Sequence, residues 1–163
     1  MTIQFSGPPD LKGQVALLTG ATGDIGATLG PALVDCGATV IATDIYTSND
    51  LFSSYENIHY YALDVTSKSR VNEVITNIKK EFGRLDIAVL AAGIAAINPI
   101  DQITDEEWEN VMRVNAYGVM NVSRSVVPLM QERGYGKIVA IGSIAGHTGG
   151  GASGLAYAAS KAA

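Results

Sequence analysis

Apolar residues recur along this chain in two spacings, which together predict alternating strands and helices. Short apolar runs predict five buried strands, at residues 14–20, 38–43, 57–63, 85–93 and 136–143. Apolar positions three and four residues apart predict helices over residues 24–36, 67–82 and 104–133, with a further helix starting near residue 152. The runs are apolar throughout, which is typical of strands buried on both faces. The pattern therefore predicts an α/β fold, a doubly wound parallel sheet with helices on each side.

Two of the predicted helices carry a readable apolar face. The helix over residues 67–82 is expected to bury a regular stripe: Val71, Val74, Ile75, Ile78 and Phe82. The next helix begins with a capping box of Thr104 and Glu107, and Pro128 is expected to kink it. One stripe of this helix is expected to face the core: Trp108, Val111, Met112 and Asn115. A buried amide such as Asn115 needs hydrogen-bond partners.

Composition narrows the class of protein. The 163 residues fit one domain, over residues 14–163, preceded by an arm over residues 1–13. With 11 Lys and Arg against 16 Asp and Glu, the net charge is −5, so we expect no nucleic-acid partner. The single cysteine, Cys36, is expected to be a buried thiol that suits a reducing cytoplasm. Neither a signal peptide nor a membrane helix is expected, and His59 and His147 have no metal-ligand spacing.

A glycine-rich turn follows the first predicted strand and opens the first predicted helix. Glycines there allow a tight turn, and they let a pyrophosphate approach the helix N-terminus, where free N–H groups attract anions. The candidate cofactor-binding residues of this turn are Gly20, Gly23, Asp24, Ile25 and Gly26. The order of strand, glycine turn and helix, with an acid at the end of the next strand, favours a dinucleotide site.

That acid is Asp44, whose carboxylate can accept the ribose hydroxyls of an adenosine. It would repel a 2′-phosphate, and neither Gly23 nor Ile45 is basic, so we predict NAD(H) rather than NADP(H) as the cofactor. The alternative is that Asp44 only caps a loop.

Further along the chain, two strand ends are candidates for the same cofactor. Asp64 and Val65 are placed to bond an adenine edge, or else they precede a helix cap. Ala91, Ala92 and Gly93 leave room for a cofactor ribose, or else form a plain turn.

A possible catalytic group lies near the C-terminus. Tyr157 and Lys161 are four residues apart and would share one face of a helix. Bringing a tyrosine pKa from near 10 to about 7 takes about 4 kcal/mol. One ammonium ~4 Å away supplies about that much at an effective dielectric near 20. Ser143, at the carboxyl end of the fifth strand, could polarise a substrate carbonyl. Asn115 could bond the backbone at a helix irregularity and hold a water that relays protons from Lys161.

Taken together, the motifs resemble the short-chain dehydrogenase/reductase family. They stand in family order: TGATGDIG (19–26), Asp44, LDVT (63–66), AAG (91–93), VNAYGVMN (114–121), GSIAG (142–146) and YAASK (157–161). The resemblance implies an NAD(P)-binding Rossmann domain and hydride transfer between NAD(H) and a small alcohol or ketone. It implies Tyr157 as general acid/base and Lys161 as the group that acidifies its hydroxyl and binds the nicotinamide ribose. It also implies that Ser143 orients substrate, that Asn115 holds the relay water, and that the protein is a homo-oligomer, often a tetramer.

Three features depart from the single-domain branch of that family. Asp24 stands where a glycine is usual, so the spacing fits TG-x-x-G-x-x-G, which is commoner in the extended branch of sugar-nucleotide epimerases. Leu90-Ala91-Ala92-Gly93 replaces the usual Asn-Asn-Ala-Gly. The sequence also stops two residues after Lys161, where the resemblance implies at least two more strands with their helices. We therefore expect the N-terminal part of an oxidoreductase, its C-terminal strands and helices missing. The alternatives are a non-catalytic NAD-binding protein and an extended-branch epimerase or dehydratase.

Overall fold

The computed structural model describes residues 7–46, 50–149 and 151–163, and in this part of the chain five parallel strands form one sheet. The strands are β1 (Val15–Thr19), β2 (Thr39–Asp44), β3 (Ile58–Ala62), β4 (Ile87–Leu90) and β5 (Lys137–Ala140). Their order is β3-β2-β1-β4-β5, and every neighbouring pair is parallel. The chain thus reverses its winding between β1 and β4, the point at which open α/β sheets bind ligands. The first six residues of the predicted arm lie outside the described residues.

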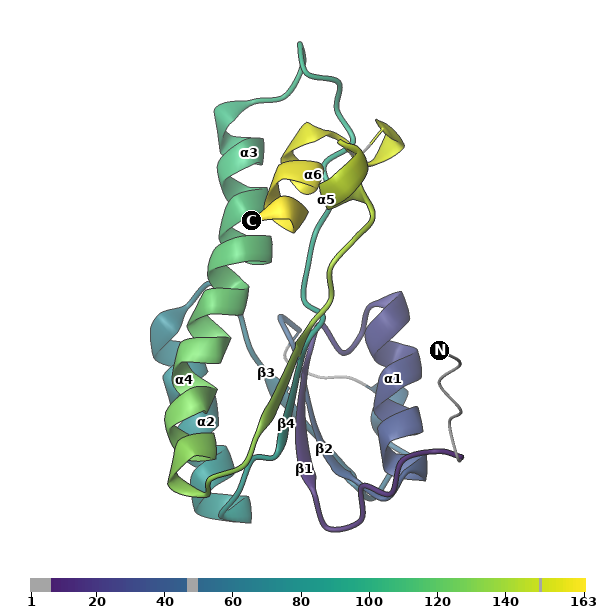
Figure 1. Cartoon of the computed structure of the whole chain (residues 1–163), viewed down its shortest axis with the longest axis vertical. Coiled ribbons are helices and arrows are strands. Elements are labelled where there is room, and N and C mark those ends of the chain that lie inside the picture. The colour runs from purple at the N-terminus through teal and green to yellow at the C-terminus, as the bar shows by residue number, and fades with distance from the viewer. Residues whose placement is uncertain (1–6, 47–49, 150) are drawn as a thin grey trace, which may run out of the picture.

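Helices cover both faces of this sheet, which confirms the doubly wound α/β prediction. The helices are α1 (Asp24–Asp35), α2 (Lys68–Phe82), α3 (Asp105–Met112), α4 (Gly118–Glu132), α5 (Ala145–Thr148) and α6 (Leu155–Ala162). Short turns of other helix types are η1 (Asp50–Phe52), η2 (Arg113–Tyr117) and η3 (Gly151–Ser153). Helix α1 lies on one face, and α2 and α4 lie on the other (Figure 1). Helices α5 and α6 stand beyond the carboxyl ends of the strands, where α6 lies beside α3 and α5 packs against α6 (Figure 1).

Alternate residues of the central strands belong to two separate hydrophobic cores, one on each face of the sheet. Leu17 belongs to the cluster packed under α2 and α4, and its neighbour Leu18 belongs to the cluster under α1. The predicted stripe of α2 is confirmed, with Val71, Val74, Ile75 and Ile78 buried and Phe82 partly buried against the same cluster. Burying each such side chain stabilises the fold by about 1.5–3 kcal/mol. This packing fixes the strand ends that carry the candidate site.

The fifth strand departs from the prediction of burial on both faces. All four residues of β5 are exposed, and Val139 keeps 49% of its surface open. In the described part of the chain β5 pairs only with β4 and forms an edge of the sheet. An apolar run predicts a strand, but its burial depends on which neighbours cover it.

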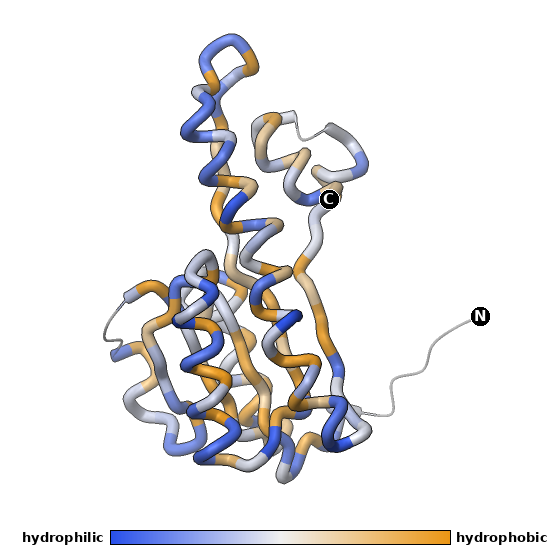
Figure 2. The backbone as a smooth tube through the Cα atoms, turned by 90° about the vertical axis from the view of Figure 1, so that its left-hand side faces the viewer, coloured by the Kyte–Doolittle hydropathy of each residue, from blue (hydrophilic) through white to orange (hydrophobic). Residues whose placement is uncertain are grey.

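The long helix predicted over residues 104–133 is divided by a π-helical turn. The chain runs from α3 through η2 into α4, and Figure 2 shows the three as one extended rod. The irregularity therefore lies at Arg113–Tyr117, and α4 continues through Pro128 to Glu132. The predicted inward stripe is only half right, because Val111 and Asn115 are buried while Trp108 is 37% exposed. Helix α3 projects past the ends of the strands (Figure 1), and Trp108 lines a surface pocket together with Met112 and Tyr117.

Two remaining expectations concern exposure and membranes. Cys36, at the end of α1, is partly exposed, so the prediction of a buried thiol is wrong. Among the described residues no helix has the length and apolar character to cross a bilayer.

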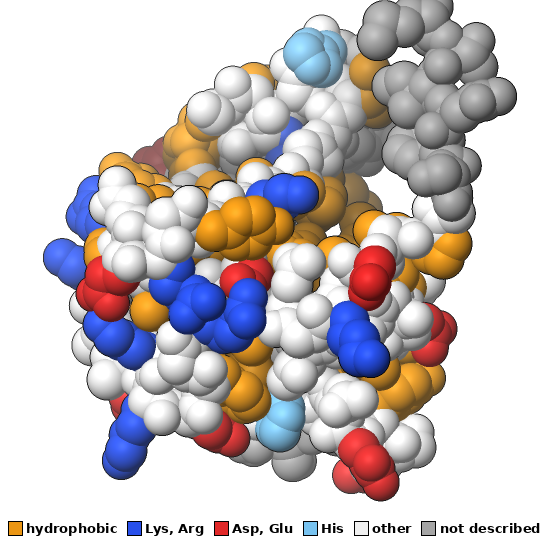
Figure 3. All heavy atoms as spheres, turned by 60° about the horizontal axis from the view of Figure 1, so that its bottom comes forward, with side chains coloured by type: hydrophobic (Ala, Val, Ile, Leu, Met, Phe, Trp, Pro, Cys, Tyr) orange, Lys and Arg blue, Asp and Glu red, His pale blue; other side chains and the backbone are white. Residues whose placement is uncertain are grey.

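Figure 3 views the molecule from the amino ends of the strands, where basic and acidic side chains are scattered among apolar ones.

Candidate functional site

Two adjoining pockets lie along the carboxyl ends of β1 and β4. One, of about 480 Å³, contains Tyr157 and Lys161, and we call it the tyrosine pocket. The other, of about 590 Å³, contains Asp44 and Asp64, and we call it the acid pocket. Both are lined by the same central residues: Gly20, Gly23, Ala91, Gly93 and Ile94. The two pockets therefore form one groove across the switch point of the sheet, and we call it the edge groove.

The glycine turn forms the middle of this groove because side chains would block it. Gly20 has a φ of 66°, in the left-handed region, and a Cβ there would lie 2.7 Å from the backbone of Ala92. A Cβ on Gly26 would overlap the carbonyl oxygen of Gly20. Gly23 caps α1 without a side chain, so no described side chain caps the first-turn N–H groups of the helix. Such a helix start suits an anionic group such as a pyrophosphate.

Asp44 ends β2 at the far side of the acid pocket. Its Oδ2 accepts the Thr22 N–H at 2.9 Å and the Thr22 hydroxyl at 2.7 Å, while its Oδ1 accepts the Ile45 N–H at 2.8 Å. The carboxylate thus braces the turn and also lines the pocket. Burial, and next the charge of Asp44, raise the pKa of Tyr60, whose hydroxyl donates to the Tyr46 carbonyl at 3.0 Å.

The other predicted cofactor residues line the same groove. Asp64 accepts the Thr66 N–H at 2.8 Å, so it closes a local turn as well as facing the acid pocket. The helix cap that Asp64 and Val65 were expected to precede is Ser67, which accepts the Arg70 N–H at 3.4 Å. The groove wall also includes the remaining predicted residues Asp24, Ile25, Gly26, Val65 and Ala92.

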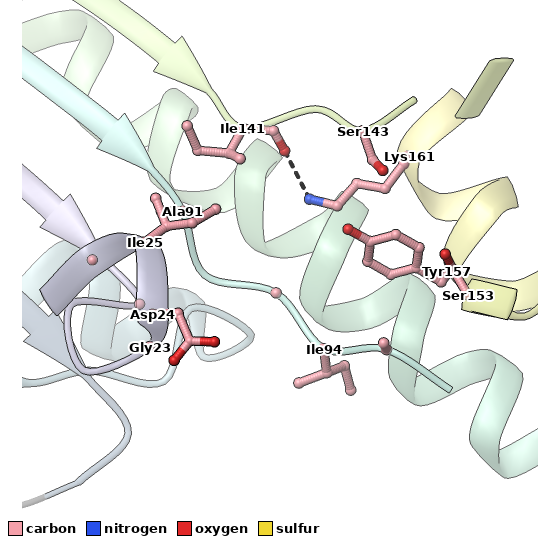
Figure 4. Close-up of a pocket in the computed structure, with 14 residues that line it drawn as sticks. Gly23, Asp24, Ile25, Ala91, Ile94, Ile141, Ser143, Ser153, Tyr157 and Lys161 are labelled. Atoms are coloured by element: carbon pink, nitrogen blue, oxygen red, sulfur yellow. Dashed lines mark hydrogen bonds between the residues drawn. The ribbon is translucent and has the colours of Figure 1, made fainter. Parts of the chain in front are cut away.

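The predicted tyrosine, lysine and serine meet at the tyrosine pocket. Helix α6 carries Tyr157 and Lys161 on one face, with the Lys161 ammonium 5.7 Å from the centre of the Tyr157 ring. Lys161 Nζ donates to the Ile141 carbonyl at 2.7 Å, which fixes the ammonium against the segment after β5. Figure 4 shows the Tyr157 hydroxyl pointing away from α6 into the pocket. Ser143 lies on the segment after β5, next to Lys161. Ser143 Oγ also accepts the Ala145 N–H at 3.1 Å.

Asn115 lies behind the groove rather than in its lining. It is 4% exposed and sits in the π-helical turn, as the predicted backbone bond at a helix irregularity requires. Its Oδ1 accepts the Ile94 N–H at 2.8 Å, and its Nδ2 donates to the Ile94 carbonyl at 2.9 Å. A Cβ on Gly93 would lie 3.3 Å from Asn115 Oδ1 and 3.7 Å from Lys161 Nζ. The amide therefore holds the loop that separates it from the groove, and its role toward a relay water stays a prediction.

Sequence reasoning missed two hydroxyl side chains that organise this site. Ser160 is buried, accepts a bond from Asn115 Nδ2 at 2.9 Å and donates to the Tyr157 carbonyl at 2.8 Å. Thr22 holds Asp44 as described above. Ser160 stands one helical turn after Tyr157, so the spacing of the two could have suggested the contact. The bonds of Thr22 depend on how β1 and β2 align, which local sequence does not reveal.

The sheet order, the glycine turn and the acid at the switch point define a dinucleotide-binding α/β fold. The sequence matches the family model for short chain dehydrogenases over residues 14–163. The chain belongs to the short-chain dehydrogenase family, whose members are oxidoreductases.

Individual relatives agree with this assignment. The chain is 37% identical over 158 residues to the 3-oxoacyl-acyl-carrier-protein reductase FabG of Thermotoga maritima, covering 93% of this chain and 64% of that one. It is 35% identical over 159 residues to the 2,3-dihydro-2,3-dihydroxybenzoate dehydrogenase of Bacillus subtilis, covering 94% of this chain and 60% of that protein. The solved structure of a short-chain dehydrogenase from Streptomyces avermitilis has a TM-score of 0.83 at 32% identity, covering 91% of this chain and 56% of that one. The chain thus spans less than two thirds of the length of each of these proteins.

Within residues 7–46, 50–149 and 151–163, no three His, Cys, Asp or Glu side chains are grouped to hold an ion.

Proposed function

We propose that this chain supplies the cofactor-binding and proton-transfer parts of an oxidoreductase that moves a hydride between NAD(H) and a carbonyl or secondary alcohol. The observation that carries the proposal is that Ser143, Tyr157 and Lys161 line the same pocket as the N-terminus of α1. When bound, the nicotinamide supplies or accepts the hydride. The two curated relatives are named for a 3-oxo reduction and for the dehydrogenation of a dihydroxy compound, which supports a small carbonyl or alcohol substrate.

In this proposal the residues of the tyrosine pocket handle the proton. The Tyr157 hydroxyl gives its proton to the substrate oxygen during reduction and takes it back during oxidation. Ser143 donates a hydrogen bond to the same oxygen and so orients the substrate. Lys161, held by the Ile141 carbonyl, lies beside the Tyr157 ring and binds the nicotinamide ribose in this proposal. Positioned proton transfer of this kind contributes about 10²–10⁴ in rate.

The acid pocket holds the adenosine half of the cofactor in the same proposal. Asp44 accepts a ribose hydroxyl, and its charge opposes a 2′-phosphate, because like charges in one pocket repel. Gly23 and Ile45, which also line this pocket, bring no positive charge, and the basic residue of its lining, Arg113, pairs with Glu109 at 3.7 Å. Asp64 and Val65 contact the adenine edge, and Ala91 to Gly93 accommodate the sugar. We propose NAD(H) as the preferred cofactor on these grounds.

Titrating the chain with NADH and NADPH, followed by nucleotide fluorescence, tests the cofactor assignment. We expect NADH to bind at least about tenfold more tightly, and Tyr157→Phe to bind it with unchanged affinity. Turnover with a 3-oxo ester or its alcohol should fall about 10²–10⁴-fold in Tyr157→Phe. Tyr135→Phe is the matched control, since Tyr135 is exposed and lines neither pocket.

Two results would count against the proposal. Tighter binding of NADPH than NADH would remove the assigned role of Asp44. Turnover by Tyr157→Phe at the wild-type rate would remove the assigned acid/base.

We also propose that the protein functions as a homo-oligomer. In its support, α3, η2 and α4 expose three large apolar side chains: Trp108, Tyr117 and Met120. Exposed apolar patches of this kind mark surfaces that bind another protein.

A further inference from the structure

Thr22 connects the glycine turn to the acid at the end of β2. It lies between β1 and α1, and it donates two hydrogen bonds to the same atom, Asp44 Oδ2. The backbone N–H lies 2.9 Å and the hydroxyl 2.7 Å from that oxygen. Hydrogen bonds to an ionised acceptor are among the stronger ones in proteins. The residue at this position of the turn thus acts on the acid directly.

The other carboxylate oxygen is held as well, which leaves little freedom to the side chain. Asp44 Oδ1 accepts the Ile45 N–H at 2.8 Å. An ionised carboxylate has about four acceptor positions, so three protein donors occupy most of them. The remaining acceptor position is on Oδ1 of Asp44, and Asp44 also lines the acid pocket. A ligand hydroxyl can use that position, while a ligand phosphate meets a negative charge that cannot turn away.

We propose that Thr22 is a positioning residue that sharpens selection of the ribose 2′-hydroxyl over a 2′-phosphate by clamping the Asp44 carboxylate. The inference rests on the proposed binding of NAD(H) in the edge groove. Thr22 is uncharged and acts by holding the Asp44 carboxylate in place. Its effect therefore appears as a difference in affinity between NADH and NADPH rather than as an equal gain for both.

The hydroxyl of Thr22 can be removed without dismantling the turn. Ala21 N–H bonds to the Thr43 carbonyl at 3.0 Å, and Leu63 N–H bonds to the Asp44 carbonyl. These backbone bonds hold β1, β2 and β3 together on both sides of the clamp. The N–H of Thr22 also keeps its bond to Asp44 whatever side chain stands there. A variant lacking only the hydroxyl therefore loosens the carboxylate selectively.

The test measures dissociation constants of NADH and NADPH for the chain and its Thr22 variants by fluorescence titration. In Thr22→Val we expect NADH affinity to fall about tenfold, or about 1.4 kcal/mol. NADPH affinity should change by less than about twofold, so the preference for NADH shrinks about tenfold. Thr22→Ser restores the hydroxyl and should stay within about twofold of wild type for both nucleotides. Thr76→Val is the matched control, because its hydroxyl donates to the Asn72 carbonyl within α2 and Thr76 lines neither pocket.

Equal losses for both nucleotides in Thr22→Val would overturn the inference, since they indicate general damage rather than lost selection. Unchanged NADH affinity in that variant would overturn it too. Should Thr22→Val fail to fold by circular dichroism, Thr22→Ala takes its place with the same expectations. Asp44→Asn distinguishes a failure of the proposed cofactor selection from a failure of the role of Thr22. An unchanged nucleotide preference in Asp44→Asn refutes the proposed cofactor selection, while a lost preference there with a silent Thr22→Val refutes the role of Thr22 alone.

Discussion

At the scale of single residues, Asn115 does the most to assemble the site. Its amide makes three hydrogen bonds, two to the backbone of Ile94 and one to Ser160. These partners come from the loop after β4 and from α6, which supply two walls of the tyrosine pocket. One buried side chain thus sets the spacing between the two walls.

Replacing Asn115 with leucine should therefore cost stability as well as the site. Leucine keeps a similar volume but leaves the N–H and carbonyl of Ile94 without their partner, and we expect a loss of about 2–4 kcal/mol. Urea unfolding followed by circular dichroism measures this loss. Asn57→Leu is the matched control, since Asn57 is exposed, and it should change stability by less than about 0.5 kcal/mol. Equal stability of the two variants would show that the Asn115 bonds contribute little.

At the scale of elements, the short helix α5 packs directly against α6. Gly146 lies so close to α6 that a Cβ would stand 2.6 Å from the Lys161 carbonyl oxygen and 2.8 Å from its carbon. Backbone atoms cannot rotate away as a flexible side chain can. The position of Lys161 therefore depends on a glycine that lines neither the tyrosine pocket nor the acid pocket.

Gly146→Ala should push α5 and α6 apart. We expect a loss of about 1–3 kcal/mol from overpacking and weaker NADH binding, because Lys161 moves with its helix. Thermal unfolding and NADH titration report the two effects. Gly142→Ala is the control, since nothing lies within 4 Å of a Cβ there and its φ is not positive. A Gly146→Ala variant as stable as Gly142→Ala would mean that the two helices part without cost.

The elements were largely predictable from sequence, and the misses have physical causes. The strands and the helices over α1 and α2 follow from local apolar spacing. Helix α5 has only four residues, too few for a period to appear. The π-helical turn at Arg113–Tyr117 places Asn115 toward Ile94 and Ser160, contacts 21 and 45 residues away in the chain. Tyr157 and Lys161 were readable because four residues on one helix bring them together, whereas the clamp on Asp44 required the alignment of β1 with β2.

At the scale of the whole molecule, Asp86 ties the amino ends of three strands together. Its carboxylate accepts the Val15 N–H at 2.9 Å and a two-pronged pair of bonds from Arg84 at 2.7 Å each. Its backbone bonds to Val15 and Lys137. The side chain is 1% exposed, and burial alone would raise the pKa of Asp86. The bonds from Arg84 and Val15, with the charges of Arg84 and Arg133, outweigh burial and hold that pKa below its usual value.

The stability of the sheet should therefore depend on acid pH through Asp86. A carboxyl group with a lowered folded-state pKa stabilises the fold above its unfolded pKa of about 4, and the gain is lost as pH falls through the folded value. We expect Asp86→Asn to be about 2 kcal/mol less stable than wild type at pH 7, with the gap narrowing below pH 4. Urea unfolding between pH 7 and pH 2.5 measures the gap, with the exposed Asp35→Asn as control. A gap that stays constant with pH would assign the loss to packing instead.

The division of the edge groove into two pockets also has a consequence in time. Every residue that lines the acid pocket lies within the first 114 positions, whereas the tyrosine pocket needs residues up to Lys161. Chains are synthesised from the N-terminus, and N-terminal parts fold first. On a ribosome the nascent chain thus contains the whole lining of one pocket while Tyr157 and Lys161 are still untranslated. The part of the groove proposed to hold the adenosine half is thus synthesised before the part proposed to transfer the proton.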